Sequence, residues 1–100
     1  MNDYLLLMHD DGPGATPRPA AEWEAYFAKL RAVGAFEGGS AIGPGVCVSK
    51  SGEPVGITRH LAGYIRIRAR DLQSARDLVA GNPVYEAGGT VEVRELPRSG

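Results

Sequence analysis

The sequence predicts an α+β domain with a ferredoxin-like β-α-β-β-α-β order, in which two helices cover one face of a four-stranded antiparallel sheet. In the C-terminal third, an alternating run at residues 61–69 leads through Asp71 into a helical segment, and a second strand-like run follows at residues 88–96. The same order of strand, helix and strand is found in the N-terminal half. Right-handed connections between these units place both helices on the same face of the sheet.

Composition indicates one ordinary globular domain, expected over residues 1–97 with a short tail at 98–100. The chain of 100 residues is 43% hydrophobic and 23% charged, with a net charge of -1, which favours neither nucleic acid nor an anionic membrane as partner. Cys47 is the single cysteine, so an internal disulfide is excluded and a cytoplasmic location is expected. The apolar run near the N-terminus is much shorter than a membrane span of roughly 20 residues.

The first strand is expected at residues 3–8, where apolar side chains fall on both parities. This pattern is typical of a central strand covered on both faces. A loop rich in glycine and proline follows at residues 9–19. A helix then begins near Pro19 and stops at Gly34, and the apolar residues expected on its buried side recur at helical spacing: Trp23, Phe27, Leu30 and Val33.

The middle of the chain is predicted to contain an edge strand and a short hairpin. Residues 36–42 form the expected strand, in which Gly38 and Gly39 indicate a bulge or an edge position. Apolar runs at residues 46–49 and 55–57 flank a turn-rich segment, which predicts a projecting hairpin.

The strand expected at residues 61–69 has the clearest alternation in the chain. Alternate residues of a strand point to opposite faces, so one face carries an apolar set and the other a polar set. The apolar set is Ile65, Ile67 and Ala69, and the polar set is Tyr64, Arg66 and Arg68. Glu92 and Glu95 of the last strand are expected to form ion pairs with the arginine row that ends at Arg70.

A second helix is expected after Asp71, which is a good N-cap. Its buried residues are predicted to be Leu72, Ala75, Leu78 and Val79, and the sequence from Gly81 to Pro83 is expected to end it. Val91 and Val93 then face the core from the last strand. This arrangement leaves one sheet face open although the first strand is apolar on both parities, so we expect a homodimer in which two sheets meet face to face.

Several segments together resemble the YCII-related family over nearly the whole chain, namely residues 4–11, 61–64, 71–78, 82–83 and 88–96. The resemblance is closest to the branch with an Asp-Gly-Pro-Phe signature, whose place is taken here by residues 54–60. A histidine that some relatives carry early in the first helix is replaced by residues 20–23. The resemblance implies a ferredoxin-like fold that dimerises as an α+β barrel. Some relatives occur beside or fused to extracytoplasmic-function sigma factors.

The candidate catalytic residues lie in two clusters. His9 follows the first strand and is next to Asp10 and Asp11, and a carboxylate can orient an imidazole that acts as general base. Neighbouring strand residues point oppositely, so Asp11 or a distant acid is an alternative partner to Asp10. A surface histidine beside turn-forming aspartates is the competing interpretation.

The second cluster is Arg59 and His60, just before the third long strand. Arg59 can hold a carboxylate or phosphate and His60 can transfer a proton, whereas the simpler alternative is solvated loop charge. Two histidines without close spacing predict no metal site, and no cofactor is expected. Asp11, Arg59, Tyr64 and Arg66 are the candidate ligand-binding residues.

Two function classes follow. The first is a dimeric protein that binds a small molecule and is either a binding protein or a cofactor-free enzyme with a His/Asp acid-base site at His9, Asp10 and His60. The second is a non-catalytic interaction or regulatory module associated with sigma-factor-linked transcription.

Overall fold

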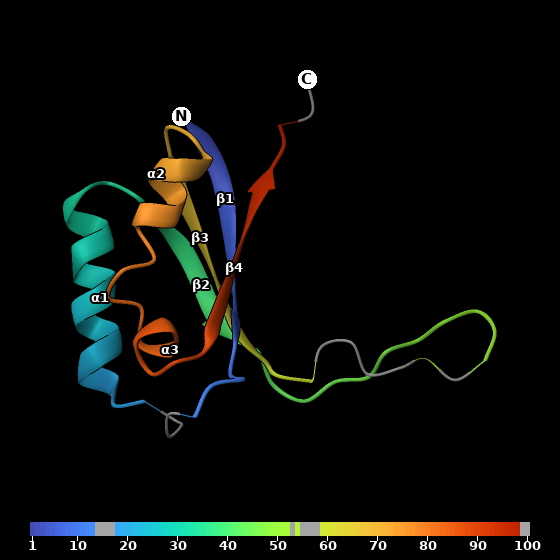
Figure 1. Ribbon diagram of the computed structural model, residues 1–100. Coiled ribbons are helices and arrows are strands. Elements are labelled where there is room, and N and C mark those ends of the chain that lie inside the picture. Colours follow the sequence, from blue (N-terminus) through green and yellow to red (C-terminus); the bar gives the residue numbers. More distant parts are fainter. Residues whose placement is uncertain (14–17, 53, 55–58, 99–100) are drawn as a thin grey trace.

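The computed structural model describes residues 1–13, 18–52, 54 and 59–98, and shows an α+β fold. The strands form one antiparallel sheet in the order β2-β3-β1-β4, compatible with a ferredoxin-like fold. Figure 1 shows the helices together on one face of the sheet. The elements of the described residues are β1 (Asn2–His9), α1 (Ala20–Ala32), β2 (Phe36–Ala41), β3 (Leu61–Ala69), α2 (Leu72–Asp77), α3 (Pro83–Glu86) and β4 (Thr90–Leu96).

β1 lies in the middle of the sheet, between β3 and β4, as its apolar sequence predicts. One side of the strand is fully buried beneath the helices. On the opposite side Leu5 and Leu7 are only half-buried in the single chain. The core thus lies between one sheet face and the helices, and its buried members include Tyr4, Leu6, Met8, Tyr26, Leu30, Ile65 and Ile67.

Helix α1 turns the predicted side to the core except at Val33, and Tyr26 is buried with it. Tyr26 and Leu30 are its buried residues, Trp23 and Phe27 are half-buried, and Val33 is 61% exposed, so the prediction was wrong for Val33. The helix ends at Ala32 and the chain reverses at Gly34, with φ 70, which leaves Val33 beyond the last turn.

Within the described residues, no helix combines the length and apolar character needed to cross a membrane.

The second predicted helix is α2, which ends before Gly81, but a third helix, α3, follows it, so the prediction of two helices was wrong. Asn82 begins α3: its buried side-chain oxygen accepts hydrogen bonds from the backbone N–H groups of Val84 and Tyr85. Pro83, expected only to end a helix, occupies a first-turn position where proline is well tolerated. Leu72, at the first position of α2, is 56% exposed rather than buried.

The predicted projecting hairpin is not formed by the residues that can be described. β2 ends at Ala41, and residues 46–49 contain no strand, while residues 55–57 lie outside the described part of the chain. In Figure 1 the segment after β2 runs away from the sheet and the helices. A strand needs a paired neighbour for its backbone groups, and this segment extends beyond the sheet that would supply one.

Candidate functional site on the open sheet face

The face of the sheet opposite the helices carries three of the predicted site residues, His9, Tyr64 and Arg66. In the registers of β1 with β3 and β4, Leu5 lies between Arg66 and Arg94, and Leu7 lies between Tyr64 and Glu92. Residues opposite one another on neighbouring strands share a face, so these side chains and that of His9 lie together. We call this surface the open face, defined by Leu5, Leu7, His9, Tyr64, Arg66, Glu92 and Arg94. The predicted placement of Tyr64, Arg66 and Arg68 opposite Ile65 is confirmed.

His9 is bonded to an acid from the other end of the chain. Its Nε2 lies 3.0 Å from Oε1 of Glu92, and the two side chains are 23% and 34% exposed. His9 is opposite Thr90 in the register, so it reaches Glu92 diagonally across the β1 and β4 pair. A carboxylate in this position fixes the imidazole orientation, which is the arrangement of a general acid-base pair.

Glu92 is in turn held by Arg94. The Nε atom of Arg94 donates a hydrogen bond of 2.6 Å to Oε2 of Glu92. This bond and the weaker effect of His9 hold the pKa of the Glu92 carboxyl below its ordinary value of 4.5. Glu92 is therefore ionised at neutral pH and can stabilise positive charge on the imidazole.

The two aspartates next to His9 have other contacts. The Asp11 carboxylate accepts hydrogen bonds from the backbone N–H and the hydroxyl of Thr90, both at 2.9 Å, and the hydroxyl bond is the main reason that the pKa of Asp11 is lowered. The backbone N–H of Asp10 donates to the carbonyl oxygen of His60 at 2.7 Å. Asp11 therefore fastens the loop after β1 to the start of β4, and Asp10 brings His60 to the His9 end of the sheet.

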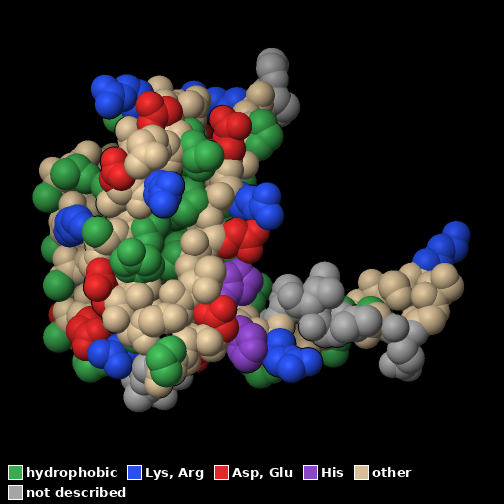
Figure 2. All heavy atoms as spheres, viewed as in Figure 1, with side chains coloured by type: hydrophobic (Ala, Val, Ile, Leu, Met, Phe, Trp, Pro, Cys, Tyr) green, Lys and Arg blue, Asp and Glu red, His purple; other side chains and the backbone are tan. Residues whose placement is uncertain are grey.

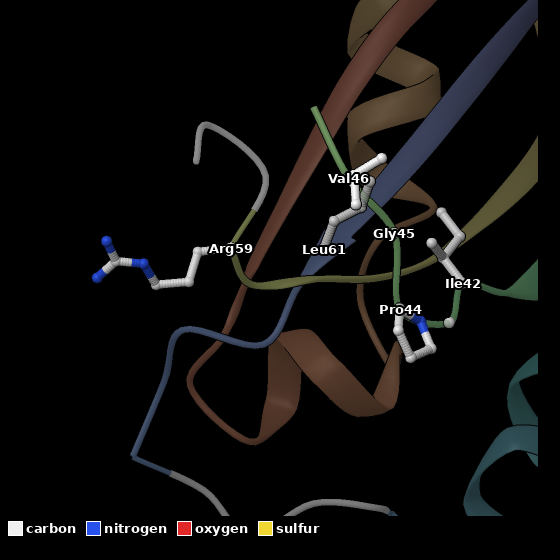
Figure 3. A pocket seen from close by; sticks show the side chains of 7 residues that line it. Ile42, Pro44, Gly45, Val46, Arg59 and Leu61 are labelled. Atoms are coloured by element: carbon white, nitrogen blue, oxygen red, sulfur yellow. The ribbon is translucent and has the colours of Figure 1, made fainter. Parts of the chain in front are cut away.

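Arg59 lies beside a half-open cavity of about 560 Å³ at that end of the sheet. In Figure 3 the Arg59 side chain points away from the other labelled residues, and both Arg59 and His60 are exposed. Leu61, which lines the same cavity, pairs with His9 in the β1 and β3 register. The cavity thus adjoins the open face without containing the His9 and Glu92 pair, and its lining residues are Ile42, Gly43, Pro44, Gly45, Val46, Arg59 and Leu61.

The ion pairs differ from the predicted ladder. Arg68 lies 3.4 Å from Glu37 and 3.9 Å from Asp3, whereas Glu92 contacts His9 and Arg94, so the prediction that Glu92 pairs with the β3 arginines was wrong. Arg66 has no ion pair among the residues that the structure describes. In Figure 2 acidic, basic and histidine side chains follow one another along the margin of the molecule beyond β4.

No family model matches the chain, and no curated protein matches it either. Across the described ranges, no group of three or more His, Cys, Asp or Glu side chains is arranged to hold a metal ion. The sequence analysis missed Glu92 and Arg94 as site residues. A signal for them existed, because Val91 and Val93 were expected to face the core, which places Glu92 and Arg94 on the opposite face with Tyr64.

Proposed function

We propose that the protein binds a small molecule on the open face and that His9, with Glu92, transfers a proton to and from it. The bond between His9 Nε2 and Glu92 Oε1 carries the proposal. With Nε2 engaged by the carboxylate, Nδ1 takes the proton from the ligand, the resulting imidazolium is stabilised by Glu92, and the proton returns to the ligand in the next step. This chemistry needs no cofactor. His60 and Asp10 stay candidate residues at the border of the site.

The same proposal includes a homodimer and membership of the YCII-related family. Leu5 and Leu7 form an apolar centre on the open face that one chain covers only in part. A second sheet placed face to face would bury it and enclose the ligand, which is the α+β barrel that the family resemblance implies. Light scattering is expected to give twice the mass of one chain at micromolar concentration. A monomer mass would contradict this part of the proposal.

A fragment screen followed by NMR tests the binding site. We expect bound fragments to shift the amide signals of Leu7, Tyr64 and Glu92, and His9→Gln or Glu92→Gln to weaken binding. Glu95→Gln is the matched control, because Glu95 is on the same strand but is opposite Tyr4, on the other face. Fragments that bind elsewhere, or that bind equally well to the His9 and Glu92 variants, would exclude the open face as the site.

A second experiment tests proton transfer. Bound fragments with an acidic C–H bond are incubated with the protein in D₂O, and the incorporation of deuterium is followed by NMR. We expect His9→Gln to slow incorporation by about 100-fold, within the range measured for loss of a general base. Equal rates of deuterium incorporation for wild type and His9→Gln would contradict proton transfer by His9 and would support a role in binding alone.

The second candidate function is an interaction module linked to sigma-factor-dependent transcription. The segment that leaves the sheet after β2 favours it, because Val46 and Val48 are 88% and 87% exposed there. Side chains of this kind in a projecting segment are typical of protein contacts. A pull-down from native extract is expected to capture a partner with wild type and to lose it with Val46→Ser and Val48→Ser. Recovery of this chain alone would count against the module.

A further inference from the structure

We infer that the ligand of the open face is a small monoanionic carboxylate with a flat apolar body, and that Arg66 holds its carboxylate group. The inference rests on the proposed binding function and names the substrate class. Its first support is the pairing of charges. The ion pairs along the open face and its border join Arg68, Arg94 and Arg98 to three acids, Asp3, Glu37 and Glu92, and none of these pairs includes Arg66.

All three acids already have basic partners. Asp3 lies within 4.0 Å of Arg68 and Arg98, Glu37 is 3.4 Å from Arg68, and Glu92 is bonded to Arg94. Arg66 is the cation left over among the described residues of this face. A guanidinium presents paired N–H donors that match the two oxygens of a carboxylate, so one anionic group fits the unused charge.

Covering the face makes this anion necessary. If a second sheet buries Leu5 and Leu7, it also removes water from Arg66, which is opposite Leu5 in the register. An unpaired buried charge is strongly destabilising, whereas a paired and hydrogen-bonded one is tolerated. A ligand carboxylate supplies the missing negative charge in each subunit without disturbing the existing ion pairs.

The spacing of the face sets the size of the ligand. Leu5 and Leu7 are two residues apart on β1, a distance of about 6.8 Å along the strand. Arg66 lies opposite Leu5, whereas Tyr64 and Glu92 lie opposite Leu7. A carboxylate on Arg66 therefore leaves a six-membered ring over Leu7 and Tyr64, with its far edge directed to the His9 and Glu92 pair. Two leucines and a tyrosine suit a flat apolar ring.

The test compares benzoate with benzamide, a neutral molecule of the same shape, by isothermal titration and NMR. Wild type is expected to bind benzoate at least about tenfold more tightly than benzamide, since a charge-assisted pair is worth this much or more. Arg66→Gln should abolish the preference and Arg66→Lys should restore part of it. Arg76→Gln, an equal charge change on α2, should retain it.

Equal binding of benzoate and benzamide, or a preference that survives in Arg66→Gln, would overturn the inference. Absence of benzoate binding at millimolar concentration would do the same. These failures differ from failure of the proposed function, because the fragment screen and the deuterium exchange at His9 do not depend on a carboxylate. An NMR spectrum of each variant shows whether it is folded as wild type.

Discussion

The carboxylate of Asp11 accepts both the backbone N–H and the side-chain hydroxyl of Thr90, each at 2.9 Å. The two residues are 79 positions apart in the sequence. This contact joins the loop after β1 to the first residue of β4, directly beside the position where His9 is paired with Thr90. Asp11 therefore fastens the end of β1, which carries the candidate base, to the start of β4.

Asp11→Ala is expected to lower the stability of the protein and to disturb the end of the open face, because both Thr90 donors lose their acceptor. Thr90→Val removes only the hydroxyl bond and should have a smaller effect. Urea denaturation gives the stability, and NMR signals of His9 and Glu92 report on the face. Identical spectra for Asp11→Ala and wild type would show that β1 and β4 hold His9 without this clamp.

The ionisation of Glu92 should depend more on Arg94 than on His9. Both lower the pKa of the Glu92 carboxyl, and the bond from Arg94 is the larger cause. We expect Arg94→Gln to raise this pKa toward 4.5 by more than His9→Gln does. Titration of the side-chain carboxyl signal by NMR measures the shift. A larger effect of His9→Gln would reverse the order of the two contacts.

Acid should destabilise the protein below about pH 4.5. Asp11, Asp71 and Glu92 all have lowered pKa values, mainly through hydrogen bonds involving Thr90, Ser74 and Arg94. Each carboxyl binds a proton more readily in the unfolded chain, so the stability it contributes is present above its ordinary pKa of 3.8 or 4.5 and is lost as the pH falls through its lowered value. The urea concentration at the unfolding midpoint, measured from neutral pH downward, should decrease once the pH is below about 4.5. Constant midpoints would contradict these assignments.

Tyr26 gives a prediction at alkaline pH. Its hydroxyl donates a hydrogen bond of 2.8 Å to the carbonyl oxygen of Leu78, which joins α1 to the end of α2. Burial raises the pKa of Tyr26 to about 12. Stability linked to this group is present below the ordinary pKa of 10.0 and is lost as the pH rises through the raised value. Titration followed by ultraviolet absorbance should show one tyrosine that ionises at a higher pH than the others, and this step should be absent in Tyr26→Phe.

The same variant should also be less stable at neutral pH. Removing the hydroxyl leaves the Leu78 carbonyl without this donor, which costs about 1–2 kcal/mol for a buried group. Tyr85→Phe is the control, because Tyr85 is half exposed. If both variants unfold at the same urea concentration as wild type, the bond from Tyr26 to Leu78 contributes nothing to stability.

The sequence predicted the sheet better than the helices. β3 has the predicted bounds because its alternation over nine residues sets both the strand and its two faces. The helical region after Asp71 was harder to interpret, since Asn82 and Pro83 can end one helix or begin another. The buried contacts of Asn82 with Val84, Tyr85 and Met8 decide between these possibilities, and such contacts depend on the tertiary fold.

The candidate site was predicted in part. Tyr64 and Arg66 were assigned correctly to one sheet face, since alternation assigns faces within a strand, whereas His9 was predicted only to follow the first strand. The bond between His9 and Glu92 depends on the register of β1 against β4. Alternation does not determine this register, because a shift by two residues keeps every side chain on the same face. The acids next to His9 in the sequence were therefore considered first, although the bonded acid is on another strand.

The pairing of β1 with β4 has a consequence for how the protein is made. His9 and Glu92 are 83 residues apart, so a ribosome synthesises a long stretch of chain after His9 before the second member of the pair exists. Contacts that close such long loops form late in folding, because the chain loses conformational entropy on closing the loop before the contacts begin to stabilise it. A nascent chain can thus form its first strand and first helix early, but it acquires its proposed acid-base pair only when the final strand docks.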